Sequence, residues 1–179
     1  MKQVIYIFGA SGSGTTTLGK AIGEKFGFYH MDTDDYFWQP TDPPYQTPRP
    51  IPERLQLMNR DIDGHEKVVI SGAIGKWGDE LKSRYTLAVR LECDTDTRIT
   101  RLKEREYRNH GERILPGGDM YEHHLEFIQW AKQFDIADEN IRSRARLDEW
   151  EKTVACPLIT MDGSADLDEK LSELKNWIK

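Results

Sequence analysis

Residues 4–20, VIYIFGASGSGTTTLGK, constrain the fold more than any other stretch of the chain. The stretch opens with an apolar, β-branched and aromatic run that ends abruptly at a glycine, as a buried parallel strand does. After a glycine-rich loop, residues 15–26 carry Leu18, Ile22 and Phe26 four residues apart, which predicts an amphipathic helix. Strand, glycine loop and helix therefore follow one another as a single unit.

The loop matches the phosphate-binding pattern GxxxxGK[ST] at all fixed positions except one. Gly9 and Gly14 occupy the glycine positions and Thr16 the hydroxyl position that binds Mg²⁺, but Thr15 stands where the pattern has lysine. In such a loop backbone N–H groups converge on phosphate oxygens, and the helix N-terminus adds partial positive charge. We therefore expect a nucleotide-phosphate site formed by Gly9, Ala10, Ser11, Gly12, Ser13, Gly14, Thr15, Thr16 and Thr17.

Two other interpretations of the loop stay open. A strand-to-helix turn that is rich in glycine and serine needs no ligand at all. The dinucleotide fingerprint GxGxxG, started at Gly12, is matched weakly because its third glycine stands at position 19 rather than 17. The strand and helix that flank the loop favour the phosphate site over both.

The whole chain has 179 residues and a formal net charge of −6, which bounds its size and its partners. The length suits a single domain, residues 1–179, and the negative charge disfavours nucleic acid, which needs a basic face. Cys93 and Cys156 lack the spacing of metal ligands, and two cysteines are too few for a disulfide framework. No apolar run reaches the ~18 residues that a membrane span needs. We expect a cytoplasmic monomer or homodimer whose partner is a small molecule, with no nucleic-acid or membrane partner.

A second chemical signal follows the strand expected at residues 28–31. At an extended strand end Asp32 and Asp34 lie two residues apart and project to the same side, whereas Asp35 points away. Because the carboxyl ends of parallel strands form the ligand crevice, both acids would face the bound phosphates. A helix cap or a turn cluster is the alternative, since Asp and Thr favour both.

GASGSGTT together with DTDDYF resembles the small P-loop kinases, an adenylate kinase-like group that includes shikimate, gluconate, uridine, nicotinamide riboside and nucleoside monophosphate kinases. In shikimate kinases a DxD pair at this point serves metal and substrate, which implies that Asp32 joins Thr16 in binding Mg²⁺. In uridine and riboside kinases the matching acid meets the substrate hydroxyl, which implies a catalytic role for Asp34. Phosphoribulokinases share threonine at the lysine position, whereas SGAIGK after the third strand departs from the DGFPR of nucleoside monophosphate kinases.

The resemblance also implies two segments that cover the site. A substrate cap is expected at about 36–64, where a proline-rich loop leads into a helix. A helical LID is expected at about 106–135, and a helical pair at residues 121–134 and 136–150, the second helix carrying Arg142.

Arginines of the LID region are the remaining candidates for phosphate chemistry, because guanidinium bonds two phosphate oxygens at once. The resemblance assigns Arg105 and Arg113 to catalysis and Arg101 to the nucleotide, while a solvated helix face with neighbouring glutamates is the alternative. After the fifth strand, Gly163 and Ser164 resemble the adenine-holding loop of these kinases, and Ser164 is a natural helix N-cap.

Five candidate strands alternate with helices, which predicts a three-layer α/β/α sandwich with a five-stranded parallel sheet. The resemblance implies the P-loop NTP hydrolase fold, with ATP and Mg²⁺ as cofactors. The expected function is ATP-dependent phosphorylation of a small hydroxyl- or phosphate-bearing acceptor such as a nucleoside, nucleotide or sugar-like metabolite. The alternative is a nucleotide-binding ATPase or regulatory switch that has no small-molecule acceptor.

Overall fold

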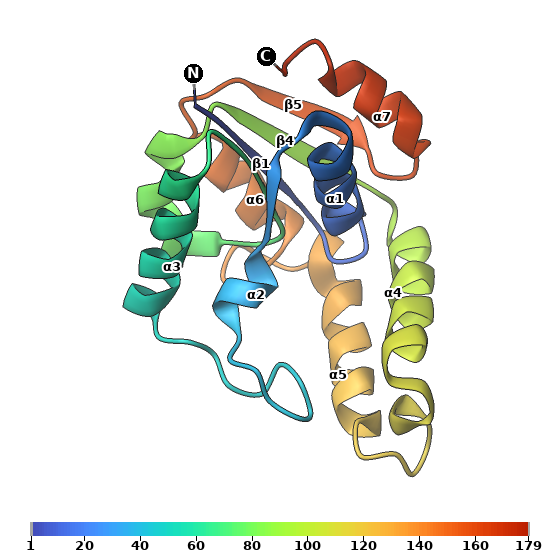
Figure 1. The fold of residues 1–179 in the computed structure, drawn as a ribbon. Coiled ribbons are helices and arrows are strands. Elements are labelled where there is room, and N and C mark those ends of the chain that lie inside the picture. The colour runs from blue at the N-terminus through green and yellow to red at the C-terminus, as the bar shows by residue number, and fades with distance from the viewer. Residues whose placement is uncertain (1, 179) are drawn as a thin grey trace.

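The computed structural model describes residues 2–178 and arranges them around one five-stranded sheet (Figure 1). Its strands are all parallel, in the order β2-β3-β1-β4-β5, which confirms the predicted α/β/α architecture. The strands are β1 (Gln3–Gly9), β2 (Tyr29–Asp32), β3 (Lys67–Ser71), β4 (Leu87–Glu92) and β5 (Leu158–Asp162). The α-helices are α1 (Thr15–Phe26), α2 (Thr33–Phe37), α3 (Ile51–Gly64), α4 (Thr95–His110), α5 (Tyr121–Lys132), α6 (Arg144–Glu151) and α7 (Leu167–Leu174). Short 3₁₀ segments are η1 (Gly75–Arg84), η2 (Gly111–Ile114) and η3 (Gln133–Asp135).

Strand β1 lies at the centre of the sheet because both of its edges carry partners. Ile5 stands opposite Val69 of β3 on one side and Leu87 of β4 on the other. Every residue of β1 is buried, as its continuous apolar run predicts for a central parallel strand. The loop that leaves the carboxyl end of β1 therefore starts from the middle of the sheet and has strand ends on both sides.

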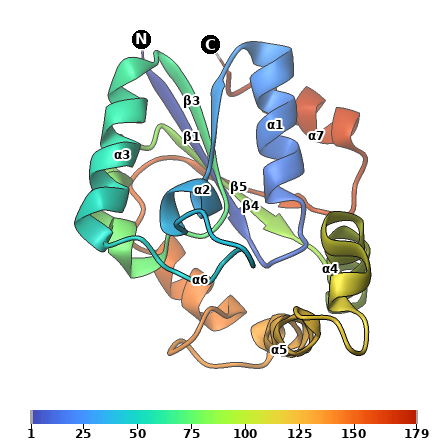
Figure 2. The same ribbon diagram turned by 60° about the horizontal axis from the view of Figure 1, so that its bottom comes forward.

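Alternate residues of β1 face two separate hydrophobic cores. Tyr6 belongs to the core on the side of α3 and α6, where Met58 of α3 is fully buried. Ile5 belongs to the core on the side of α1 and α7, together with Leu18 and Leu171 (Figure 2). The sheet is thereby covered on both faces, which parallel sheets require.

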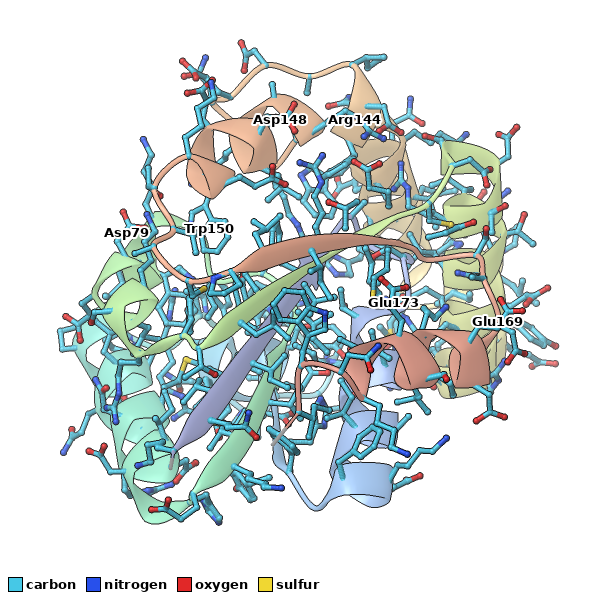
Figure 3. The ribbon with its side chains drawn as sticks, turned by 90° about the horizontal axis from the view of Figure 1, so that it is seen from above. Asp79, Arg144, Asp148, Trp150, Glu169 and Glu173 are labelled. Carbon is cyan, nitrogen blue, oxygen red and sulfur yellow. The ribbon has the colours of Figure 1, made fainter. Side chains whose placement is uncertain are left out.

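Aromatic rings fill the space between the sheet and α6. Tyr6 and Phe8 stack with their ring centroids 5.4 Å apart, and Tyr85 lies 4.9 Å from Tyr6. Trp150 of α6 meets Tyr6 and Phe8 edge-on at 5.3 and 4.8 Å, and Figure 3 labels it between α6 and the strands. These contacts hold α6 against the sheet, although α6 buries no residue completely.

Helices α4 and α5 run side by side and project from the sheet (Figure 1). Ile99 and Leu102 of α4 pack against Ile128 and Ala131 of α5, which forms a small core apart from the two that cover the sheet. The segment 106–135 therefore holds the end of α4 and all of α5, which form a helical hairpin with the rest of α4, and its role as a LID stays a prediction.

Two helix predictions are wrong. The expected helix at 136–150 begins only at Arg144, because Ser143 caps α6 by accepting a hydrogen bond from the Arg146 N–H and donates from its own hydroxyl to the Asp138 carbonyl. Arg142 therefore lies in the linker before α6 and not on a helix. Ser164 does not cap α7, since Asp166 is the N-cap and Ser164 bonds to the Asp162 carboxylate instead.

Both cysteines are free thiols, and burial raises the pKa of Cys93 and of Cys156. A raised thiol pKa leaves little of the reactive thiolate at neutral pH. Within residues 2–178 no helix combines the length and the apolar composition that crossing a bilayer requires.

Candidate active site

The glycines of the phosphate loop are required by the space around them. A Cβ on Gly9 would lie 2.5 Å from the Leu91 carbonyl oxygen, and one on Gly12 would lie 2.6 Å from the Arg98 carbonyl oxygen. Gly12 also has a φ of 84°, a left-handed conformation that glycine adopts readily. The loop is thus packed directly on the backbone of β4 and α4, which fixes its path.

The N-terminus of α1 is open to an anion. Gly14, with a φ of 98°, is the N-cap, and no side chain caps the helix or places a carboxylate in its first turn. The unpaired N–H groups and the helix dipole both favour phosphate at such an end. In the same loop Ser13 Oγ is buried without a hydrogen-bond partner, as expected of a donor that awaits a ligand.

Thr16 and Asp32 meet at the mouth of this loop. The Thr16 hydroxyl donates a 2.9 Å hydrogen bond to Asp32 Oδ2, which joins the start of α1 to the end of β2. Within residues 2–178 no group of three His, Cys, Asp or Glu side chains could hold a metal by itself. Oxygen donors such as these two suit Mg²⁺, which normally completes its shell with water and substrate phosphate.

Asp34 is near Asp32 for a different reason from the predicted one. The strand ends at Asp32, and Asp34 lies in the short helix α2, where its N–H donates a 3.1 Å hydrogen bond to Asp32 Oδ1. The expectation that alternation along a strand places the two acids on one side is therefore wrong, and the helix-cap alternative holds for Asp32. Their proximity remains, because the cap folds the chain back on itself.

The two acids of α2 have different surroundings. Partial desolvation raises the pKa of Asp34, the Asp32 charge raises it further, and the Arg142 and Arg105 charges lower it. Desolvation and Asp32 also raise the pKa of Asp35, but there the opposing charges are His30 and Lys20. Both residues keep exposed surface. Asp34 thus lies near two arginines, whereas Asp35 lies near His30 and Lys20.

Arg101 and Gly163, both predicted to hold the nucleotide, are in contact. The Arg101 guanidinium donates a 3.1 Å hydrogen bond to the Gly163 carbonyl and lies 3.8 Å from the Cys93 sulfur. A Cβ on Gly163 would lie 2.6 Å from the Ser13 carbonyl oxygen. The loop after β5 is therefore packed against the phosphate loop, and Ser164 holds its turn through Asp162.

Arg105 and Arg113, predicted to act on the phosphoryl group, lie on the projecting helices. The Arg105 side chain is 50% exposed and lies 3.5 Å from Glu106. Arg113 bonds to Asp119 of its own loop and, at 2.9 Å, to Asp42 of the cap segment. Of these two arginines, Arg105 is the one whose charge lowers the Asp34 pKa.

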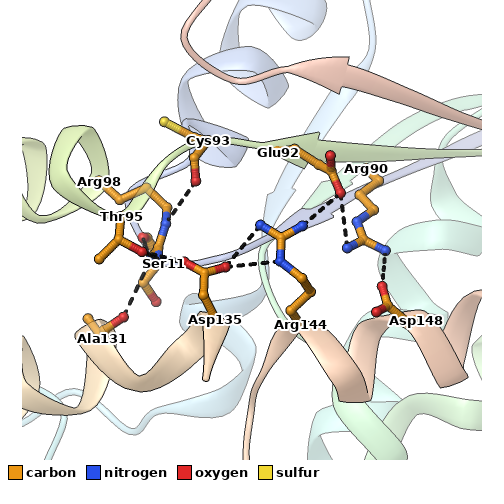
Figure 4. Close-up of polar contacts among 10 residues, drawn as sticks. All are labelled: Ser11, Arg90, Glu92, Cys93, Thr95, Arg98, Ala131, Asp135, Arg144 and Asp148. Atoms are coloured by element: carbon orange, nitrogen blue, oxygen red, sulfur yellow. Dashed lines mark hydrogen bonds and ion pairs between the residues drawn. The ribbon is translucent and has the colours of Figure 1, made fainter. Parts of the chain in front are cut away.

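Two arginines that the sequence did not assign lie closer to the phosphate loop. Arg98 is completely buried and joins the Ser11 and Cys93 carbonyls to the Asp135 carboxylate. Figure 4 shows this contact as one end of a chain of ion pairs, whose other members are Arg144, Glu92, Arg90 and Asp148. Nothing in a helix sequence distinguishes such an arginine from a solvated one.

Arg142 is the second of these arginines. Its guanidinium donates a 2.7 Å hydrogen bond to the carbonyl of Gly9, the first residue of the phosphate loop. From the sequence, Arg142 is expected only as part of a helix at 136–150, with no role in the site. The contact spans 133 positions of the chain, so no local pattern reports it.

The cap segment places aromatic side chains beside Asp34. Trp38 and Tyr45 meet edge-on at 6.0 Å, and the Arg54 guanidinium lies 3.7 Å above the Phe37 ring. Tyr45 has a φ of 63°, which is strained for an aromatic residue. Desolvation raises the Tyr45 pKa and the Asp34 charge adds to that effect, which places the phenol near the acid.

The chain matches a protein-family model described as AAA domain over residues 5–129. It is 37% identical over 178 residues to a Bacillus subtilis protein named uncharacterized protein YqaC, covering 99% of this chain and 98% of that protein. A shorter match, 42% identical over 41 residues, joins it to shikimate kinase 2 of Sodalis glossinidius and covers 23% of this chain and 24% of that one.

Solved structures share the whole fold. A shikimate kinase from Bacteroides thetaiotaomicron has a TM-score of 0.53 at 20% identity, covering 98% of this chain and 97% of that one. A gluconokinase from Sinorhizobium meliloti has a TM-score of 0.52 at 17% identity, covering 98% and 93%. The predicted likeness to small-molecule P-loop kinases is thereby confirmed at the level of the fold.

Proposed function

This chain belongs to the AAA domain family, and from that premise we propose that it is an ATP-dependent phosphotransferase acting on a small hydroxyl- or phosphate-bearing acceptor. The observation that carries the proposal is the 2.9 Å hydrogen bond from the Thr16 hydroxyl to Asp32, next to Asp34. It brings the phosphate loop together with an acid that can receive a proton. The likeness to folds that are kinases by name supports the same reaction class.

ATP would be held mainly by backbone groups. The N–H groups between Gly9 and Thr17 would receive the phosphates, because glycine leaves the backbone uncovered there. The loop of Gly163 and Ser164, fixed by Arg101, would meet the base. Thr15 would add one hydroxyl hydrogen bond and no charge.

Thr16 and Asp32 would hold Mg²⁺, Thr16 through its hydroxyl and Asp32 directly or through water. When bound, Mg²⁺ neutralises charge on the terminal phosphates of the nucleotide. The first task of Asp32 in this chain is structural, because it caps α2 and so sets the position of Asp34.

The transfer itself requires a base beside the acceptor. The acceptor oxygen forms a bond to the γ-phosphorus while the bond from that phosphorus to the β–γ bridging oxygen breaks, and ADP leaves with the electron pair. The hydroxyl proton passes to the Asp34 carboxylate. The raised pKa of Asp34 makes this carboxylate a better proton acceptor than an ordinary aspartate.

Arg105 and Arg113 would act when the projecting helices approach the nucleotide. Arg105 already lies near enough to influence Asp34 electrostatically. Arg113 would first have to leave Asp42 and Asp119. Exposed ion pairs of this kind contribute little free energy and are readily exchanged for phosphate.

The test is ADP release from ATP and Mg²⁺ with a panel of nucleosides, sugars and nucleoside monophosphates. We expect release that depends on one acceptor class, and Asp34→Asn should lower that turnover at least ~10²-fold, the usual effect of losing a positioned base. Calorimetric ATP affinity should be unchanged in the variant, because Asp34 does not belong to the phosphate loop.

Asp35→Asn is the matched control, since it neutralises the neighbouring acid whose surroundings differ. It should retain turnover. Normal turnover in Asp34→Asn with loss in Asp35→Asn would assign the base to the other acid. Release of ADP that no acceptor stimulates would identify an ATPase or switch, and absence of ATP binding would overturn both readings.

A further inference from the structure

The phosphate loop has no cation of its own. Thr15 replaces the lysine of the pattern, and the first turn of α1 holds no charged residue. Lys20 is the nearest lysine along α1, but it lies more than one helical turn beyond Thr15, and its charge acts on His30 and Asp35. Phosphoryl transfer concentrates negative charge on the transferred group, so a cation from elsewhere in the fold is needed for efficient catalysis.

The other arginines near the loop are already engaged. Arg98 is sealed in the interior by Asp135 and backbone carbonyls, and Arg101 holds the Gly163 carbonyl. Arg113 is paired with Asp42 and Asp119 at the far end of the projecting helices. None of these guanidiniums is available to a phosphoryl group without breaking its present contacts.

Arg142 differs from them in three respects. It bonds to the first glycine of the loop, the 2.7 Å contact with the Gly9 carbonyl. Its Nε is buried and has no hydrogen-bond partner, and the Asp34 carboxylate acts on it through its charge, without a hydrogen bond. Its charge also acts on Asp34, which places Arg142 near the proposed base as well as beside the phosphate loop.

This state of Arg142 is costly unless a ligand completes it. A buried donor without an acceptor costs about 1–3 kcal/mol of stability, and more when the group is charged. Desolvation lowers the Arg142 pKa, yet the residue keeps part of its surface exposed, so a ligand can reach it. A phosphoryl oxygen would supply the missing acceptor, and the planar guanidinium can bond two such oxygens.

We infer that Arg142 is a catalytic residue that contacts the transferred phosphoryl group and supplies the positive charge that Thr15 leaves absent from the phosphate loop. The inference rests on the proposed phosphotransfer. It assigns the charge to the linker before α6, outside the segment 106–135. Arg142 takes part in no bond exchange: it stabilises charge on the γ-phosphoryl oxygens while that group passes from ATP to the acceptor and ADP leaves.

The test uses MgADP with and without fluoroaluminate, a mimic of the transferred phosphoryl group that needs no acceptor. Calorimetry should show that Arg142→Met binds MgADP within threefold of the parent but MgADP–fluoroaluminate at least ~10²-fold more weakly, the usual effect of removing a transition-state donor. Arg142→Lys, which keeps a point charge, should lie between the two. Arg60→Met, on an exposed arginine of α3, should match the parent in both titrations.

A second variant separates charge supply from structure. Thr15→Lys restores the lysine of the phosphate-loop pattern, and in the Arg142→Met background it should recover fluoroaluminate affinity at least ~10-fold. If Arg142→Met alone proves unstable, Arg142→Lys and the double variant take its place in the titrations. Melting curves of these two variants show that the compared proteins are folded.

Three outcomes are distinguishable. Equal fluoroaluminate affinity in the parent, Arg142→Met and Arg142→Lys would overturn the assignment while leaving the kinase proposal intact. Equal loss of MgADP and MgADP–fluoroaluminate binding, without rescue by Thr15→Lys, would reduce Arg142 to a structural role. A parent protein that binds neither MgATP nor MgADP would remove the proposed function, and the assignment with it.

Discussion

The phosphate loop and the tip of the projecting helices both combine glycine with arginine, but the surrounding protein holds them in opposite ways. At the loop, Arg98 is 0% exposed and Gly12 touches the backbone of α4. At the tip, the Arg113 side chain is 39% exposed, and a Cβ on Gly117 would meet nothing within 4 Å. One region is built into the core before any ligand arrives. The other keeps contacts that water and phosphate can replace.

The largest difference should appear when each arginine is replaced. Arg98→Met leaves the Ser11, Cys93 and Asp135 oxygens without their buried donor, and we expect it to lower the free energy of unfolding by about 3–5 kcal/mol. Urea denaturation followed by circular dichroism measures this change. Arg113→Met is the control and should leave the urea midpoint unchanged, because its ion pairs are exposed. Equal midpoints for the two variants would contradict the contrast.

The glycines should show a smaller difference of the same kind. Gly12→Ala adds a close contact with the Arg98 carbonyl to the strain of a φ of 84°, and we expect a loss of about 2–4 kcal/mol of stability. Gly117→Ala has a similar φ of 91° but open space, so it should lose only about 1 kcal/mol. The same urea titrations decide it. If Gly117→Ala cost as much as Gly12→Ala, packing against α4 would not be the cause.

The smallest effect concerns two acids whose pKa values shift in opposite directions. Desolvation raises the Asp34 pKa, so ionised Asp34 lowers the stability of the folded state above that pKa. Asp34→Asn should therefore raise the melting temperature slightly at pH 7. Near pH 3, where the Asp34 carboxyl is protonated, the substitution should have no effect. Hydrogen bonding from Thr97 lowers the Asp94 pKa, so ionised Asp94 favours folding at neutral pH. Asp94→Asn should therefore lower the melting temperature at pH 7, and this loss should vanish as acid protonates the parent. Shifts of the same sign in calorimetry would refute the interpretation.

Local patterns were enough for most of the fold. Each strand is a short apolar run before a turn. The spacing of Gly9, Gly14 and Thr16 identified the loop because residues close together in the chain form it. The start of α2 was also readable: an acid that caps a helix, followed by further acids in its first turn, is a helix signal. The same residues also suit an extended strand end, so the local pattern alone does not decide between the two.

Long-range placement was not readable. The sequence of α4 does not distinguish buried Arg98 from exposed Arg105, since both lie on a strongly charged helix. The contact from Arg142 to Gly9 depends on where α6 is anchored, and that follows from Trp150 packing on the rings of β1. The sequence therefore predicted the part of the candidate site that consecutive residues form. It did not predict the part that residues distant in the chain contribute.

The central position of β1 has a consequence for how the protein acquires its structure. Strand β1 pairs with β3 and β4, and both of these strands come much later in the chain; Lys67 of β3, for example, stands opposite Gln3. Such non-local pairing must bear the entropy of closing a long loop, which slows folding. The phosphate loop therefore cannot take its final shape as soon as it is synthesised, because β1 stays without its partners until β3 and β4 have emerged.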